Sequence, residues 1–234
     1  MKSNKLIEAK YKLTLSEIKL IFTLISQIKP DDEAFKMYSI KVKDLIDMLN
    51  IISENYYTTI KTTLKGLLSK PVIIEDKNYK NDYLMCNWVS SAKYTGKEGV
   101  INIELSQQLK PYLLELKSHF TVYGLDSILK LKSVYSIRLY EILLKEYHYY
   151  GKKRISFVFS IKELKAMLGI KENEYLLFSN FKIKILDVAE KELKAKSSLY
   201  FEYKTIKTGR AITDIEFTVI EKEKKQKQLI TTDD

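Results

Sequence analysis

The sequence predicts an α+β fold made of two tandem winged-helix domains, related by pseudo-symmetry through an internal duplication. Two observations lead to this prediction. A spacing of 119 residues, such as that from Leu24 to Leu143, superimposes the two halves of the chain. Each half also shows the order helix, strand, helix, helix, hairpin, which is typical of a helix-turn-helix followed by a two-stranded wing.

The repeat superimposes a helix, a strand and two further helices, and it needs no gap over that stretch. The clearest match is a short helix in which four apolar positions and their spacing recur. The paired residues are Leu45, Met48, Leu49 and Ile51 in the first half, and Leu164, Met167, Leu168 and Ile170 in the second. We therefore expect a first domain at 1–125, a second at 126–220, and a charged tail at 221–234. The tail lacks apolar periodicity, which predicts disorder.

In the first copy, Thr14 and Glu17 form the capping-box pattern that marks a helix start, and the polar run 29–32 ends that helix. Helical spacing and alternation then predict the remaining elements in order. They are a strand at 35–42, a helix at 43–49, a helix at 55–69, and a wing formed by strands at 71–75 and 83–90 around a polar turn at 77–82.

The second copy follows the same plan. The predicted elements are a helix at 132–150, a strand at 155–159, a helix from Ser160 to Gly169, a helix at 175–195, and a hairpin with a basic turn at 207–210. The helix at 175–195 is expected to bury Phe178, Phe181, Ile185, Val188 and Ala189. We call the third helix of each copy its reading helix.

Charge points to the partner of these domains. The 234 residues contain 40 Lys and Arg against 30 Asp and Glu, a net charge of +10 with a pI near 9.3. Such a balance favours a polyanionic partner, although plain solubilising charge is an alternative. No apolar run approaches the ~20 residues of a membrane span, and no secretory signal opens the chain. A cytoplasmic location without a membrane partner is therefore expected.

The residues offer little catalytic chemistry. The single cysteine excludes an internal disulfide, and the two histidines, His119 and His148, lie too far apart in sequence for a metal-binding pair motif. No phosphate-binding GxxxxGK[ST] loop occurs, and adjacent carboxylates such as Asp31 and Asp32 suit solvated charge better than an acid/base pair. We expect no enzyme activity, no metal and no cofactor.

Three segments carry a family resemblance. Residues 4–21, 109–123 and 131–141, the last reading Leu-Lys-Ser-Val-Tyr-Ser-Ile-Arg-Leu-Tyr-Glu, resemble the theta-type, iteron-binding plasmid replication initiators, the Rep proteins. The resemblance extends over roughly 4–220. It implies monomers that bind iteron repeats in double-stranded origin DNA, help to open an AT-rich segment, and bring in the host initiator and the replicative helicase.

The resemblance also implies a homodimer that binds an inverted repeat at its own promoter and represses it. The first domain would supply much of the dimer contact and the second domain the main sequence-reading helix.

Candidate DNA contacts lie on both reading helices and on one wing. Base contacts come mainly from the first turns of a reading helix. In the second domain the resemblance implies a reading helix that begins near Ser179, with contacts from Ser179, Asn180, Lys182 and Lys184. Lys182 has the least favourable helical phase, but it matches a Phe-Lys pair of the family pattern. The matching candidates in the first domain are Thr58, Lys61, Thr62 and Lys65, on a face without acidic residues. Lys207 and Arg210 at the second wing tip suit phosphate or minor-groove contact.

Two features leave alternatives open. Arg138 could brace the domain interface through a carboxylate or touch DNA. The acidic residues Glu172, Glu174 and Asp187, which flank the second reading helix, could accept hydrogen bonds from cytosine amino groups or simply cap and solvate. Two other function classes also remain, a winged-helix transcription regulator without initiator activity and a protein-interaction module. The module predicts no duplex binding and little salt dependence.

Overall fold

The computed structural model describes residues 1–29, 31–52, 55–76, 79, 81–114, 116, 120–122, 124–150 and 155–222. Residues 223–234, most of the tail predicted to be disordered, lie outside the described residues, as does part of the predicted turn at 77–82. None of the helices in the described ranges has the length and apolar composition to cross a bilayer.

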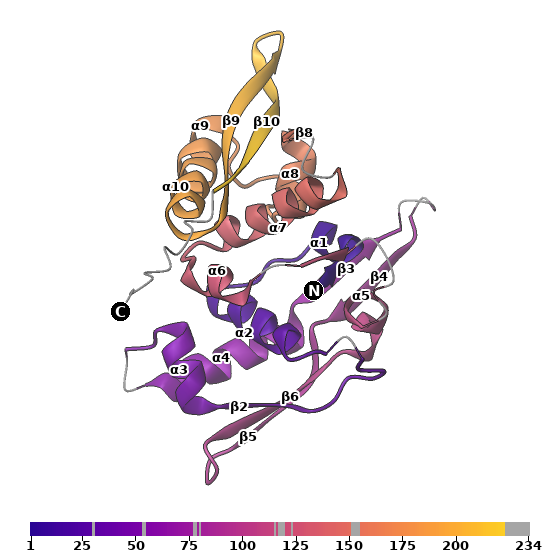
Figure 1. The fold of residues 1–234 in the computed structure, drawn as a ribbon, viewed down its shortest axis with the longest axis vertical. Helices are drawn as coiled ribbons and strands as arrows, with labels where there is room; N and C mark the ends of the chain where they lie inside the picture. The colour runs from indigo at the N-terminus through magenta and orange to yellow at the C-terminus, as the bar shows by residue number, and fades with distance from the viewer. Residues whose placement is uncertain are drawn as a thin grey trace, which may run out of the picture.

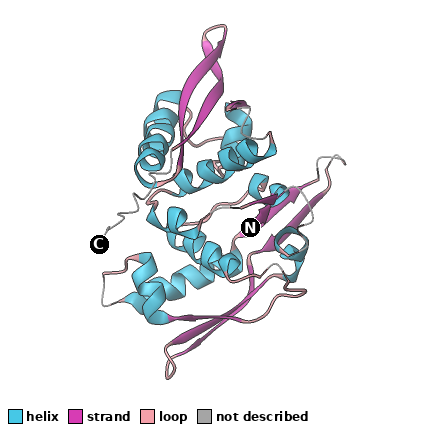
Figure 2. Cartoon of the chain, in the orientation of Figure 1, coloured by secondary structure: helices cyan, strands magenta, loops and turns pink. Residues whose placement is uncertain are grey.

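The elements of the first half precede a long central helix, α7 (Figures 1 and 2). They are β1 (Lys2–Ser3), α1 (Asn4–Glu8), α2 (Leu15–Ser26), β2 (Tyr38–Lys41), α3 (Val42–Leu49), α4 (Tyr56–Ser69), β3 (Pro71–Glu75), β4 (Tyr83–Asn87), β5 (Val89–Thr95), β6 (Val100–Leu105), the 3₁₀ turn η1 (Gln107–Leu109), α5 (Lys110–Leu113), β7 (Phe120–Thr121) and α6 (Leu125–Lys130).

The second half begins at α7 and ends in a long hairpin. Its elements are α7 (Val134–Tyr149), β8 (Ser156–Ser160), α8 (Ile161–Met167), α9 (Phe178–Phe181), the π-helical turn η2 (Lys182–Leu186), α10 (Asp187–Lys196), β9 (Leu199–Thr208) and β10 (Ala211–Glu221). We call the continuous stretch Phe178–Lys196 the second reading segment, because it replaces the single predicted helix.

The predicted duplication is present in the structure. Helices α2 and α7 begin 119 residues apart, at Leu15 and Val134, and so do α3 and α8, at Val42 and Ile161. Each half also carries a three-stranded antiparallel sheet of the same order, β2-β6-β5 in the first and β8-β10-β9 in the second. The fold is therefore two winged-helix domains, as predicted. Their wings project from opposite ends of the molecule (Figure 1).

The predicted first wing is wrong. The expected hairpin exists as β3 and β4, but it forms a separate two-stranded sheet. The true wing is β5–β6, because β6 pairs with β2 in the register Tyr38↔Ile103. The extra hairpin is held by the N-terminal segment instead, since Lys10 and Ile73 exchange backbone hydrogen bonds of 2.9 and 3.0 Å. Alternation predicts a hairpin, but it does not show which strand the hairpin will join.

A buried charged cluster joins the two halves. The Arg138 guanidinium in α7 is 1% exposed and donates to Glu141 at 2.9 Å and to the hydroxyl of Tyr11. It also donates to three backbone carbonyls, those of Ile7 at 2.7 Å, Ala9 at 3.2 Å and Met167 at 2.9 Å. Of the two alternatives for Arg138, the structure therefore supports the brace.

The N-terminal residues complete this cluster. The ammonium of Lys2 is fully buried, 3.0 Å from Glu141 and 4.0 Å from the ring centroid of Phe22. Burial lowers the pKa of Lys2 to about 8, although the Glu141 carboxylate opposes that shift. Close packing continues at Gly169, where φ is +68° and a Cβ would lie 2.2 Å from the Tyr11 carbonyl oxygen. The first eleven residues thus bind the second domain to the first.

Candidate nucleic-acid interface

Helix α4 is the first reading helix, and it packs closely on α2. Gly66 allows this contact because it has no side chain: a Cβ there would lie only 1.8 Å from the Glu17 carboxylate. Glu17 caps α2 and pairs with Lys70 at 2.7 Å. The core face of α4 is buried at Ile60, Thr63, Leu64, Gly66 and Leu67. The four predicted contact residues share the exposed face: Thr58, Lys61, Thr62 and Lys65.

The first wing adds basic residues that the sequence interpretation missed. Tyr57 in α4 stacks edge-on against Tyr94 in β5, with 5.3 Å between ring centroids, which ties the reading helix to the wing. Lys93 and Lys97 are exposed on this hairpin. The sequence pattern that could have predicted this hairpin is the alternation of Ile101, Ile103 and Leu105 after a turn at 96–99. All three side chains are fully buried.

The second reading segment contains a π-helical turn. Its core face consists of Phe181, Ile185, Leu186, Ala189 and Leu193, all fully buried. The predicted burial of Val188 is wrong, since that side chain is 38% exposed. A π turn accommodates one more residue than an α turn, so it shifts the apolar stripe onto Leu186. The four predicted contact residues of this segment are all exposed: Ser179, Asn180, Lys182 and Lys184.

One of these, Lys182, is held by its own segment. Its ammonium donates to both carboxylate oxygens of Asp187, at 3.0 and 2.9 Å, and the hydroxyl of Tyr203 in β9 donates to the same carboxylate. Burial alone would raise the pKa of Asp187, but the hydrogen bonds from Tyr203 and Lys182 hold it below its ordinary value. Desolvation and the bond to Asp187 raise the pKa of Tyr203 to about 12. The cluster joins the reading segment to the second wing.

Two further acidic residues, Glu172 and Glu174, precede the second reading segment. Glu174 accepts from Lys12 at 2.6 Å and from the backbone amide of Lys171 at 2.9 Å. The bond from Lys12 contributes most to lowering the pKa of Glu174. Glu172 is exposed. Asp187 and Glu174 therefore have structural partners in this conformation, which favours the capping and pairing alternative over base contact.

The second wing carries its basic turn at the tip. Lys207 and Arg210 are exposed on either side of Gly209, whose φ of +63° places it in the left-handed region that glycine readily adopts. These two cations lie at the end of the β9–β10 hairpin, which projects from the body (Figure 1). The hairpin therefore places the positive charges of Lys207 and Arg210 at a distance from the reading segment.

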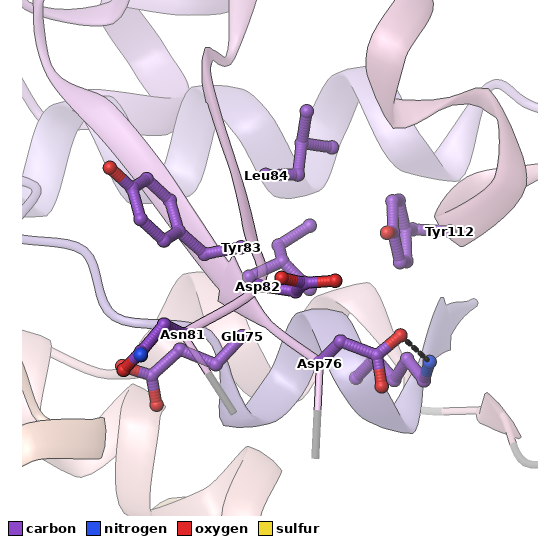
Figure 3. A pocket seen from close by; sticks show the side chains of 9 residues that line it. Glu75, Asp76, Asn81, Asp82, Tyr83, Leu84 and Tyr112 are labelled. Carbon is purple, nitrogen blue, oxygen red and sulfur yellow. Dashed lines mark hydrogen bonds and ion pairs between the residues drawn. The ribbon is translucent and has the colours of Figure 1, made fainter. Parts of the chain in front are cut away.

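An acidic region lies elsewhere, beside the extra hairpin. Glu75, Asp76 and Asp82 surround a hollow of about 430 Å³ together with Tyr112 (Figure 3), and Lys5 pairs with Asp76 at 3.5 Å. Carboxylates disfavour close approach of a phosphate backbone. Nucleic acid is therefore expected on the reading surfaces and wings, and not at this hollow.

Comparison with known proteins identifies relatives of both domains. Residues 1–144 match a family model described as initiator replication protein, WH1, and residues 160–219 match one described as initiator Rep protein, WH2. A replication initiation protein from Escherichia coli is 28% identical over 202 residues, which are 85% of this chain and 62% of that protein. The PI protein from Escherichia coli is 30% identical over 166 residues, 65% of this chain and 53% of that protein.

The chain thus spans between about half and two thirds of the length of these relatives. A solved structure shares the fold, the crystal structure of the Pi initiator protein in complex with iteron DNA. It superimposes with a TM-score of 0.74 at 23% identity and covers 95% of this chain and 97% of that one. The family resemblance noted in the sequence is confirmed by the two family models.

Proposed function

Because the chain belongs to the Rep family of plasmid replication initiators, we propose that it binds double-stranded iteron DNA at a plasmid origin and starts replication there, in the cytoplasm. The observation that carries the proposal is the duplicated arrangement of an exposed basic reading surface beside a wing, in a chain of net charge +10. Two such surfaces on one braced scaffold suit one long polyanion.

The two domains have different tasks in this proposal. The first, residues 1–125, contacts the DNA backbone through Thr58, Lys61, Thr62 and Lys65, and supplies the contact of a homodimer. The second, residues 126–220, reads sequence. Its contacts are Ser179, Asn180 and Lys184, with Lys182 next to them and with Lys207 and Arg210 on phosphate or in the minor groove.

The oligomeric state selects the DNA site. Monomers bind the iterons and recruit the host initiator and the replicative helicase, whereas dimers bind the promoter inverted repeat and repress transcription. Family membership supports both activities.

A salt titration tests the DNA-binding surfaces. We expect Lys65→Ala and Lys184→Ala each to weaken duplex binding and, where the lysine also neutralises a phosphate, to lower the slope of log affinity against log salt by about one unit. Lys5→Ala is the matched control, since Lys5 lies beside the acidic hollow. Unchanged affinity and slope in both variants would overturn the assignment of the reading surfaces.

A maintenance assay tests initiation itself. The gene with its complete flanking DNA should sustain an otherwise non-replicating circle in its host, and the Lys184→Ala gene should sustain it less well. DNA binding without maintenance would instead support the alternative function, a winged-helix transcription regulator.

A further inference from the structure

The most exposed large aliphatic side chains in the described ranges lie just before or within the two reading elements. Among the large aliphatic residues that the structure describes, the four highest exposures belong to Ile52 at 91%, Leu176 at 77%, Leu177 at 66% and Ile183 at 61%. Ile52 precedes α4, and the other three lie within eight residues at the start of the second reading segment. Single exposed apolar side chains are ordinary, but a cluster of them marks a contact surface.

Ile183 lies within the π turn, on the side of the segment opposite buried Phe181 and Ile185. Its counterpart in the repeat, Leu64, is only 9% exposed on the core face of α4. Three successive side chains, of which Ile183 is the middle one, face solvent between buried Phe181 and Ile185, as the spacing of four along a helical face dictates. Such π turns are frequent at functional sites.

Leu177 occupies a position that leucine rarely stabilises. It is the N-cap residue of α9, and no side-chain hydrogen bond caps that helix. Ser133 and Ser160, in contrast, cap α7 and α8 through their hydroxyls. Leucine is among the poorest N-cap residues. A sequence that breaks a local rule while exposing the side chain indicates a role for that side chain.

These leucines share a hollow with the polar candidates. Leu176, Leu177, Asn180 and Lys184 line one depression of about 430 Å³ at the start of the second reading segment, together with Glu174, whose carboxylate is paired with Lys12. An amide that can read a base edge, a cation that can meet a phosphate, and two aliphatic side chains therefore face the same space. In the major groove, the apolar group that such side chains can contact is the C5 methyl of thymine.

We propose that Leu177 and Ile183, with Leu176 beside them, contact thymine methyl groups in the major groove and so make the second reading segment selective for thymine at defined positions. This inference rests on the proposed function, because it requires the segment to enter the groove of bound DNA. Lysines on the same segment attract the duplex, and the aliphatic side chains discriminate among its bases.

The test removes the methyl group from the DNA. A duplex selected by the full chain from a random-sequence pool is resynthesised with each thymine replaced in turn by uracil, which keeps base pairing. We expect one or more replacements to weaken binding roughly fourfold, the effect of losing one buried methyl. Leu177→Ala and Ile183→Ala should weaken binding to the thymine duplex and should remove most of the sensitivity to uracil at one position each.

Val158→Ala serves as the control, because Val158 is an aliphatic side chain of similar exposure, 52%, on β8. It should bind both duplexes as the wild type does. The thermal unfolding midpoints of all three variants should equal that of the wild type, since the side chains are exposed.

The outcomes separate the inference from the proposed function. Sequence-specific binding that is indifferent to every uracil, as a patch reserved for a protein partner would give, overturns the inference and leaves the proposed function intact. Variants that keep full sensitivity to uracil overturn it as well. Absence of sequence-selective binding to any duplex overturns both.

Discussion

Helix α4 and the second reading segment occupy the same place in the repeat, yet they present different chemistry to solvent. Helix α4 is a regular helix of 14 residues whose outer face carries hydroxyls and lysines. The second segment is preceded by exposed leucines, includes a π turn and holds one lysine against Asp187. Hydroxyls and lysines suit a phosphate backbone, whereas amide and aliphatic side chains can distinguish bases.

The two elements nevertheless share part of their buried face. Packing constrains the buried positions of a helix, since a change of one methylene there is felt throughout the core. Leu67 and Leu186, a pair in the repeat, are accordingly both 0% exposed. Exposed positions carry no such constraint, so the two surfaces can diverge toward different tasks on one architecture.

The largest expected effect comes from breaking the brace between the two halves. Arg138→Ala leaves Glu141 buried without its guanidinium, so the free energy of unfolding should fall by about 3–5 kcal/mol. Denaturant titration measures the loss. Arg210→Ala, at an exposed wing tip, should change stability by less than about 0.5 kcal/mol. A loss below about 1 kcal/mol for Arg138→Ala would contradict a bracing role.

A smaller effect should separate the tasks of the two reading surfaces. Asn180→Ala should cost about 1–3 kcal/mol of binding free energy and relax sequence preference, because it removes a base contact. Thr62→Ala should cost less and should weaken selected and shuffled duplexes alike. Competition binding with both duplexes measures this difference. Equal loss of preference in the two variants would contradict the division of labour.

The smallest effect concerns the pH dependence of the N-terminal contact. The pKa of Lys2 is lowered from 10.5 to about 8 in the folded protein. Between pH 8 and 10 the unfolded chain therefore binds more protons at this side chain, so its contribution makes the free energy of unfolding rise with pH, by at most about 1.4 kcal/mol per unit. Burial raises the pKa of Tyr11, which acts in the opposite sense above pH 10.

Lys2→Met should remove that contribution. Denaturant unfolding at pH 8, 9 and 10 should give a smaller slope for this variant than for the wild type. Lys5→Met, at an exposed position, should retain the wild-type slope. Identical slopes in all three proteins would contradict the lowered pKa of Lys2.

Local patterns predicted much of the fold. Thr14 and Ser160 accept the capping hydrogen bonds that their sequence context indicates, and α3 ends at Asn50, with a φ of +53°. The exposure of the candidate side chains on both reading surfaces, except that of Lys182, also followed from helical periodicity. Such features depend on residues three or four apart, so a linear pattern contains the relevant neighbours. Direct DNA contact by these side chains stays a prediction.

Other features depended on distant partners. The choice of β5–β6 as the first wing was decided by pairing with β2, and the extra hairpin by pairing with Lys10. The π turn, after which Val188 faces solvent, begins at Lys182, whose partner Asp187 also binds Tyr203 of the second wing. A local sequence pattern cannot predict these strand pairings or the position of the π turn. Each depends on contacts with residues that lie far away along the chain.

The sequence by itself thus determined the duplication, most of the duplicated helices and strands, the basic character and the exposed face of α4, since these follow from periodicity and composition. Only the tertiary structure decided the wing assignment, the pairing of Lys182 with Asp187, and the burial of Lys2, Arg138 and Glu141 in one cluster. The physical reason is that charges and strand edges are satisfied by whichever groups the fold brings near, and those groups lie far away along the chain.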